Sequence, residues 1–136
     1  MTDRNPAARH YFTARKAAAG LGAAGTGTAQ HWAMTVSAVA LALLTPFAVA
    51  YLARGIGLPP EGVVRRFGQP LAAIVLGLFV VVGMIHWMRG TRILIDDYVR
   101  GAARTWALIA VQIAGWAVIA AAVYALVRMA LIAVAL

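Results

Sequence analysis

The sequence predicts an all-α integral membrane protein with three transmembrane helices, and three observations support this fold class. The chain of 136 residues is 63% hydrophobic and only 12% charged, whereas soluble domains carry roughly 25% charged residues. Its apolar residues lie in three long blocks, each with the roughly 20 residues that a helix needs to cross a bilayer. Its cations gather in the segments between these blocks, where membrane topology requires them.

The first predicted span covers about residues 31–53. Its polar residues are hydroxyl-bearing, namely Thr35, Ser37 and Thr45, and such hydroxyls can bond back to carbonyls of their own helix. Pro46 lies inside the block, so we expect a kink there. The following segment, residues 54–69, contains several glycines and prolines and is predicted to be a loop.

The second predicted span covers about residues 69–92. Pro70 suits the first turn of a helix, where its missing N–H is not needed. His86 is the single ionisable residue of the apolar run between Pro70 and Trp87. The segment 89–104 contains no proline, so the helix can continue beyond the apolar run for several turns.

The third predicted span covers about residues 105–128, and the apolar block continues past Arg128 to the end of the sequence. The arginine is expected to reach the far interface with its charged end, followed by a short tail. The three spans together form a predicted membrane domain over residues 31–136.

The distribution of cations predicts the orientation. Residues 1–30, read as a basic cytoplasmic tail in preference to a transit peptide, and residues 89–104 together hold eight of the twelve Lys and Arg residues. The positive-inside rule therefore places the N-terminus in the cytoplasm. Aromatic residues at the block ends fit an interfacial belt, namely Trp32, Tyr51, Trp87 and Trp106.

Composition also excludes several kinds of site. The chain has no cysteine, so it holds no disulfide, iron–sulfur cluster or thiolate zinc site of its own. The net charge is +8, but the sequence has no basic face with interleaved aromatic residues, so we do not expect it to bind nucleic acid. A small cofactor-free membrane protein, either a transporter or a structural protein, is a further alternative. No acidic residue lies within a predicted span, which argues against the transporter.

His86 is the most informative residue for chemistry. An ionisable side chain inside a span is costly and usually marks a site, and neutral imidazole is a common axial ligand of haem iron. Gly83 and Gly90 flank it on one helix face, which leaves room for a flat macrocycle. A histidine that bonds a neighbouring helix is an equally good interpretation. His31 offers a second ligand from the same chain, or a solvated interfacial side chain.

Further candidate residues follow on the same segment. Tyr98 can donate a hydrogen bond to a quinone carbonyl at the membrane edge, although an interfacial tyrosine is the better interpretation of this residue by itself. Asp96 has arginines four residues before and after it, Arg92 and Arg100, which favours solvated helix salt bridges. Arg89 and Arg92 are candidate partners of haem propionates, with topology as the simpler explanation of their charge.

Taken together, these residues resemble the hydrophobic membrane anchor of succinate dehydrogenase, the SdhD-type subunit of respiratory complex II, in its proteobacterial members. One matching motif is His86, a glycine four residues later, and the pair Asp97-Tyr98. The other is the Leu-Gly-x-Ala-x-x-Gly-Thr run over residues 21–28, which precedes His31-Trp32 and Ser37-Ala38. The resemblance covers nearly the whole chain.

The resemblance implies a haem-containing helix bundle that this chain forms with a second, SdhC-like anchor subunit. His86 would be one axial ligand of the haem b iron, and Asp97 and Tyr98 would belong to a ubiquinone-reduction site. Gly90 and the two arginines, Arg89 and Arg92, would support the haem or its propionates. An iron–sulfur subunit and a flavoprotein subunit would dock on the cytoplasmic face of the bacterial inner membrane, which we prefer to the mitochondrial one.

Two points temper this assignment. Many members of the family carry an arginine near the haem where this chain has Thr35, which leaves the propionate partner open. A fumarate reductase anchor, and a self-contained cytochrome b that uses His31 and His86, stay as alternatives. In every version we expect no catalytic activity from this chain alone, so any enzymatic activity belongs to the assembled succinate:quinone oxidoreductase.

Overall fold

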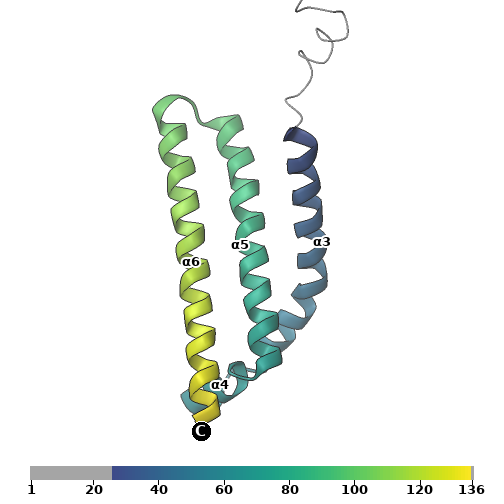
Figure 1. Cartoon of the computed structure of the whole chain (residues 1–136), viewed down its shortest axis with the longest axis vertical. Coiled ribbons are helices and arrows are strands. Elements are labelled where there is room, and N and C mark those ends of the chain that lie inside the picture. The colour runs from purple at the N-terminus through teal and green to yellow at the C-terminus, as the bar shows by residue number, and fades with distance from the viewer. Residues whose placement is uncertain (1–25, 136) are drawn as a thin grey trace, which may run out of the picture. The chain divides into compact units, whose positions relative to one another are not determined.

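The computed structural model of the protein describes residues 26–135, and every regular element in that range is a helix. The order is α3 (Thr26–Ala53), α4 (Pro60–Phe67), α5 (Pro70–Tyr98) and α6 (Gly101–Ala135) (Figure 1). The chain divides into two compact units, Met1–Ala33 and Met34–Leu136. Most of the expected basic tail, residues 1–25, lies outside the described residues.

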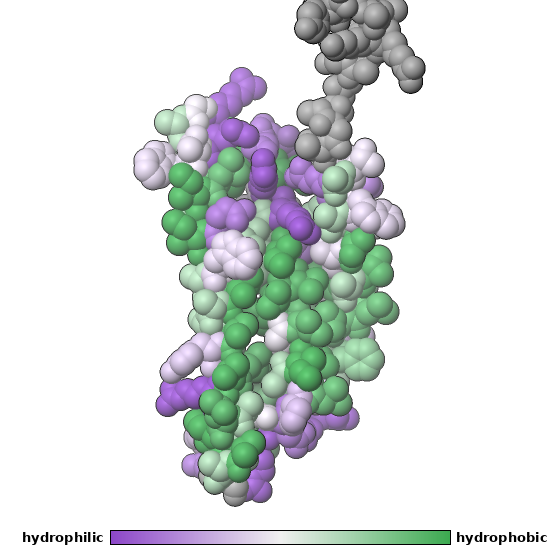
Figure 2. Space-filling model, viewed as in Figure 1, coloured by the Kyte–Doolittle hydropathy of each residue, from purple (hydrophilic) through white to green (hydrophobic). Residues whose placement is uncertain are grey.

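Three of the four helices are long and apolar enough to cross a membrane, which confirms the predicted fold class. The candidate spans are Gly27–Ala53, Pro70–Tyr98 and Gly101–Ala135. The second helix continues beyond residue 92 to Tyr98, as the absence of proline allowed. Within the second unit, Figure 2 shows an apolar surface along the helices, with hydrophilic residues at the helix ends. Many large apolar side chains are exposed there, as expected for a lipid- or partner-facing surface.

The prediction of a loop over residues 54–69 is wrong for its second half, where α4 forms. Pro60 stands in the first turn, which tolerates a residue without N–H. Glu61 lies in that turn, and Arg65 and Arg66 lie in the last one, so the charges complement the helix dipole. The glycines and prolines of this segment indicate a turn, and the structure has one at Gly57, where φ is +80°. The short helix α4 follows it.

Glycine permits close packing of α6 against its neighbours. A Cβ on Gly68, at the end of α4, would lie 2.5 Å from the backbone oxygen of Met129 and 2.6 Å from the Cβ of Ala133. On α5, the buried Met88 side chain occupies the space that a side chain at Gly115 would need. Small residues therefore set the spacing of the helices, as in other membrane bundles.

The turn between α5 and α6 is short. The N–H of Val99 donates to the carbonyl of Ile95 at 2.9 Å and closes α5. Gly101 then begins α6 with a φ of +66°, which glycine adopts at no steric cost. As a result, Tyr98 is the last residue of α5.

Two of the three hydroxyl groups noted in the first span, those of Ser37 and Thr45, bond back to their own helix as predicted. Thr45 Oγ1 donates to the Leu41 carbonyl at 2.6 Å, and Ser37 Oγ donates to the Met34 carbonyl at 2.9 Å. Helix α3 continues through Pro46 without interruption. The kink at this proline stays a prediction.

Candidate functional site

The candidate site is centred on His86 of α5, which faces a buried serine of α3. The Nδ1 atom of His86 lies 2.9 Å from the Oγ of Ser37. The serine is only 7% exposed, and its hydroxyl also lies 2.9 Å from the carbonyl oxygen of Met34. This contact joins residues that are far apart in the sequence and links α3 to α5 within the second unit.

The geometry of the serine favours one tautomer of the histidine. A hydroxyl group has a single proton, and Ser37 directs it to the Met34 carbonyl. The serine oxygen is then an acceptor for the N–H at Nδ1 of His86. In this tautomer the lone pair lies on Nε2, and no group among residues 26–135 hydrogen-bonds that atom. In this tautomer Nε2 carries the lone pair through which a neutral imidazole can bind a metal.

A stripe of residues on α5 around His86 faces α3. The α5 stripe is Gly83, His86 and Gly90, at spacings of three and four residues. Opposite the two glycines lie α3 side chains. A Cβ on Gly83 would be 3.7 Å from Leu41 Cδ2, and one on Gly90 would be 3.8 Å from Met34 Cε. The glycines do flank His86, but α3 side chains face them. The idea that they make room for a macrocycle stays a prediction.

The contribution of the Ser37–His86 bond to stability is expected to be small. Hydrogen bonds between membrane helices contribute about 0.6 kcal/mol on average. Apolar packing along α5 and α6 contributes to the bundle independently, for example where Met88 is buried against Gly115. The contact matters more for the orientation of the imidazole than for the stability of the fold.

Asp96 forms two ion pairs after His86, one within α5 and one across the turn to α6. Arg92 Nε lies 3.7 Å from Asp96 Oδ2. The closer partner of Asp96 is Arg104, whose Nη2 and Nε lie 2.7 and 2.8 Å from Oδ1. The expected partner four residues on, Arg100, was the wrong choice, because α5 ends at Tyr98 and the helical spacing does not continue. The Asp96–Arg104 pair therefore joins the end of α5 to the start of α6.

Tyr98 and Asp97 lie at the end of α5, away from His86. Twelve residues of helix separate Tyr98 from His86, a rise of about 18 Å at 1.5 Å per residue. The tyrosine is 82% exposed, and Asp97 is also exposed. The structure does not bring these residues together with the histidine. A pocket around Tyr98 would therefore need walls from other subunits.

The residues present fit one axial ligand position of a haem. The described residues contain no cluster of three or more His, Cys, Asp or Glu side chains that could hold a metal ion. His86 by itself offers one nitrogen ligand with a fixed tautomer, as one axial position of a haem requires. The second ligand would have to come from another chain, or from His31. That histidine belongs to the first unit, so the one-chain alternative stays a prediction.

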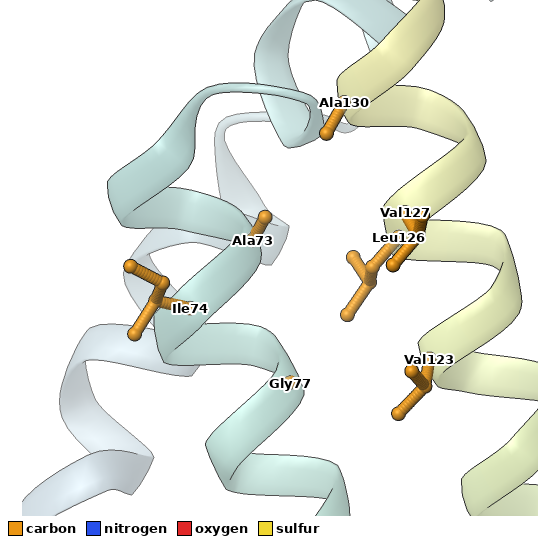
Figure 3. Close-up of a pocket in the computed structure, with 7 residues that line it drawn as sticks. All are labelled: Ala73, Ile74, Gly77, Val123, Leu126, Val127 and Ala130. Carbon is orange, nitrogen blue, oxygen red and sulfur yellow. The ribbon is translucent and has the colours of Figure 1, made fainter.

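A separate hollow between α5 and α6 has no chemistry of its own. It encloses about 240 Å³ and is lined by the apolar residues Ala73, Ile74, Gly77, Val123, Leu126, Val127 and Ala130 (Figure 3). Gly77 is nine residues from His86, about 14 Å along α5. This hollow suits a hydrocarbon chain and is distinct from the candidate site.

Sequence reasoning missed one residue of the site. The sequence identifies Ser37 as a polar residue of the first span and as part of a matching motif, but it does not indicate a partner for the hydroxyl. Its signal was available, because a buried hydroxyl in an apolar helix needs a partner. The sequence could not show that the partner would be His86, since that depends on which faces of α3 and α5 meet.

Comparisons with known proteins agree with this architecture. The model of the succinate dehydrogenase/fumarate reductase transmembrane subunit family matches residues 1–133. The chain is 57% identical over 121 residues to the succinate dehydrogenase hydrophobic membrane anchor subunit of Paracoccus denitrificans, covering 89% of this chain and 94% of that protein. No solved structure gave a significant match.

These findings confirm the resemblance inferred from the motifs around His86 and before the first span, including its SdhD-type, proteobacterial character. They also agree with three apolar helices of spanning length, so the protein is a multi-pass membrane protein. The chain belongs to the succinate dehydrogenase/fumarate reductase transmembrane subunit family and is a succinate dehydrogenase membrane anchor subunit.

Proposed function

We propose that this chain anchors a succinate:ubiquinone oxidoreductase, respiratory complex II, in the bacterial inner membrane. In this proposal it supplies one axial haem b ligand, His86, and part of the ubiquinone-reduction site, Tyr98 and Asp97. Succinate oxidation and the transfer of electrons toward the membrane belong to partner subunits. The chain itself holds the assembly in the bilayer and shapes the place where quinone is reduced.

A single observation carries the haem proposal, namely the contact of His86 Nδ1 with Ser37 Oγ at 2.9 Å. It supports the tautomer that leaves Nε2 free in an apolar part of the membrane. A bound haem b would provide a one-electron store close to the path of the electrons. The residues of this chain hold and orient the ligand. Arg89 and Arg92, one and two turns nearer the turn between α5 and α6, are the proposed partners of the propionates, and Gly90 supports the α3 contact.

The quinone proposal depends on exposure at the end of α5. Reduction of ubiquinone takes two electrons and two protons, so negative charge develops on the carbonyl oxygens. The Tyr98 hydroxyl is free to donate a hydrogen bond to one of these oxygens, and the neighbouring Asp97 can pass a proton from water. The ion pair of Asp96 with Arg104 holds the turn that carries them.

The proposed partners are a second, SdhC-like anchor subunit, an iron–sulfur subunit and a flavoprotein subunit. The second anchor is required because this chain supplies one axial ligand from its second unit. The proposed orientation has the N-terminus and the α5–α6 turn in the cytoplasm. It depends on the four cations before residue 26, which lie outside the described residues. Fumarate reductase is the second family function, but the 57% identical relative is a succinate dehydrogenase subunit.

The experiment that tests this function is purification of the complex in mild detergent through a tag on this chain. We expect co-elution of a flavoprotein and a reduced-minus-oxidised absorption band of a b-type haem. The His86→Ala variant should lose this band, whereas the matched His31→Ala variant should keep it. Retention of the band in the His86→Ala complex would contradict the assignment. Loss of the band in His31→Ala instead would favour a haem held within this chain.

A further inference from the structure

We propose that Ser37 is a positioning residue for the haem ligand, fixing the tautomer and the ring orientation of His86. The inference rests on the proposed function, because it concerns a haem bound through Nε2 of that histidine. It adds a residue from a different helix whose hydroxyl acts on the iron through the imidazole. Ser37 itself would not touch the haem.

The first step in the argument is the buried position of the hydroxyl. Ser37 is 7% exposed and lies in the predominantly apolar part of α3. A buried hydroxyl without partners is costly. The hydroxyl lies 2.9 Å from each of two polar atoms, the Met34 carbonyl oxygen and His86 Nδ1. Its donor and acceptor functions are therefore both used.

The second step is the direction of the hydrogen bonds. The carbonyl oxygen of Met34 can only accept, so the serine proton goes to it. The N–H of the imidazole then lies on Nδ1 and points to the serine oxygen. The opposite arrangement, with a proton given to Nδ1, would leave two oxygen atoms facing each other at 2.9 Å without a proton between them.

The third step is the position of α3 side chains on both sides of the histidine. Gly83 and Gly90 lie three residues before and four residues after His86, and a Cβ on each would lie 3.7 Å from Leu41 Cδ2 and 3.8 Å from Met34 Cε. Side chains of α3 therefore face α5 before and after His86, and Ser37 lies opposite its ring. A ring held by one nitrogen keeps its plane when the other nitrogen binds a metal.

The expected consequence is electronic as well as geometric. An N–H donated from Nδ1 places more electron density on Nε2 and raises the basicity of the ligand. A more basic ligand stabilises ferric iron more than ferrous iron, which lowers the reduction potential of the haem. Removing the acceptor should therefore raise the potential and loosen the ring orientation, while the fold persists on its apolar contacts.

The test is the Ser37→Ala variant of the whole detergent-purified complex. We expect a higher midpoint potential in a redox titration of the haem band and changed g-values in its low-spin EPR spectrum. We also expect loss of haem to excess apomyoglobin to be roughly 10- to 100-fold faster, the usual effect of removing such an outer hydrogen bond. These readouts do not depend on quinone reductase activity.

Three further variants make the result specific. Ser37→Thr keeps a hydroxyl and should restore the wild-type potential. Ser37→Cys offers only a weak acceptor and should change the potential in the same direction as Ala but less, which also provides a reading if the Ala complex does not assemble. Thr45→Val deletes a hydroxyl that bonds the carbonyl of Leu41 in the same helix, and should leave the haem unchanged.

The two proposals can fail separately. If Ser37→Ala and Ser37→Cys keep the wild-type potential, g-values and rate of haem loss, while His86→Ala loses the haem band, the positioning role is overturned and the proposed function stands. If His86→Ala keeps the band, the proposed function fails, and this inference fails with it.

Discussion

The two sides of α5 differ in what they contribute to the molecule. The side that meets α3 carries a hydrogen bond between buried Ser37 and His86, at 2.9 Å. The side that meets α6 is apolar, with Met88 packed against Gly115. The hollow farther along the same two helices is lined entirely by apolar side chains (Figure 3). In the proposed function the α3 side orients the haem ligand, whereas the α6 side contributes apolar packing.

This difference separates stability from function along one helix. Apolar packing between α5 and α6 stabilises the bundle without selecting any ligand, since it consists of many weak contacts. The Ser37–His86 contact should contribute little to stability by comparison, but in our proposal it sets which nitrogen of His86 carries the proton. Substitutions on the α6 side should therefore change unfolding, and substitutions on the α3 side should change the haem.

The largest expected effect is on quinone reduction and comes from Tyr98, at the end of α5, not from either side of the helix. Replacement of Tyr98 by Phe removes one hydrogen-bond donor from the proposed quinone oxygen. We expect quinone reduction by the complex to fall by roughly 10²-fold, as for loss of one donor to a developing oxyanion, with an unchanged haem spectrum. The control is Tyr124→Phe, an exposed tyrosine of α6 that should keep full activity. Full activity in Tyr98→Phe would remove this residue from the quinone site.

A large stability effect is expected where α4 approaches α6. The Gly68→Ala variant places a methyl group 2.5 Å from the Met129 backbone oxygen, and overpacking of this kind costs about 1–3 kcal/mol. Thermal unfolding of the purified complex should shift to lower temperature, with the haem potential unchanged. The control, Gly77→Ala, meets Leu126 Cδ1 at 3.6 Å and should unfold like the wild type. Equal unfolding temperatures of the two variants would show that the close contact at Gly68 does not destabilise the protein when a methyl group is added.

An effect of intermediate size is expected at the turn between α5 and α6. Gly101 has a φ of +66°, which an L-residue adopts at a cost of roughly 1–2 kcal/mol. The Gly101→Ala variant should lose about this much unfolding free energy. Since the turn carries Tyr98, the Michaelis constant for quinone should also rise. Unchanged stability would mean that the turn relaxes to another conformation.

The smallest effect is expected for the ion pairs of Asp96. The Arg104→Gln variant removes contacts of 2.7 and 2.8 Å, whereas Arg92→Gln removes one of 3.7 Å. Partly exposed pairs contribute about 0.2–1 kcal/mol, so the loss of unfolding free energy in Arg104→Gln should lie in this range and should vanish at high salt. Because Arg92 is also a proposed haem partner, Arg92→Gln should in addition change the haem spectrum, whereas Arg104→Gln should not. An unchanged unfolding free energy of Arg104→Gln at low salt would contradict a stabilising role of this pair.

Most of the architecture could be predicted from the sequence, because the thickness of a bilayer fixes the length of an apolar helix. The three spans and the extension of α5 to Tyr98 follow from this constraint and from the position of proline. Helix α4 was missed because Pro59 and Pro60 indicated a loop, although proline at the start of a helix is also favourable. Its charged residues, Glu61, Arg65 and Arg66, were the available signal.

The pairing of side chains could not be predicted in the same way. His86 can be identified from the sequence because an ionisable side chain is costly within a membrane span. Its contact with Ser37 depends on the rotation of two helices about their axes, which the sequence does not show. The distribution of apolar residues around α3 and α5 does not predict this rotation, since the membrane-spanning part of each helix is apolar on nearly all sides. Likewise, the choice of Arg104 over Arg100 as partner of Asp96 depends on where α5 ends.

The most direct test of the account is chemical rescue at position 86 in the whole complex. The His86→Gly variant should lack the EPR signal of a low-spin haem with two imidazole ligands, and addition of imidazole should restore it. This result would show that the ligand binds at the place vacated by the histidine. A low-spin signal that persists in His86→Gly without imidazole would contradict the claim that this residue binds the haem iron.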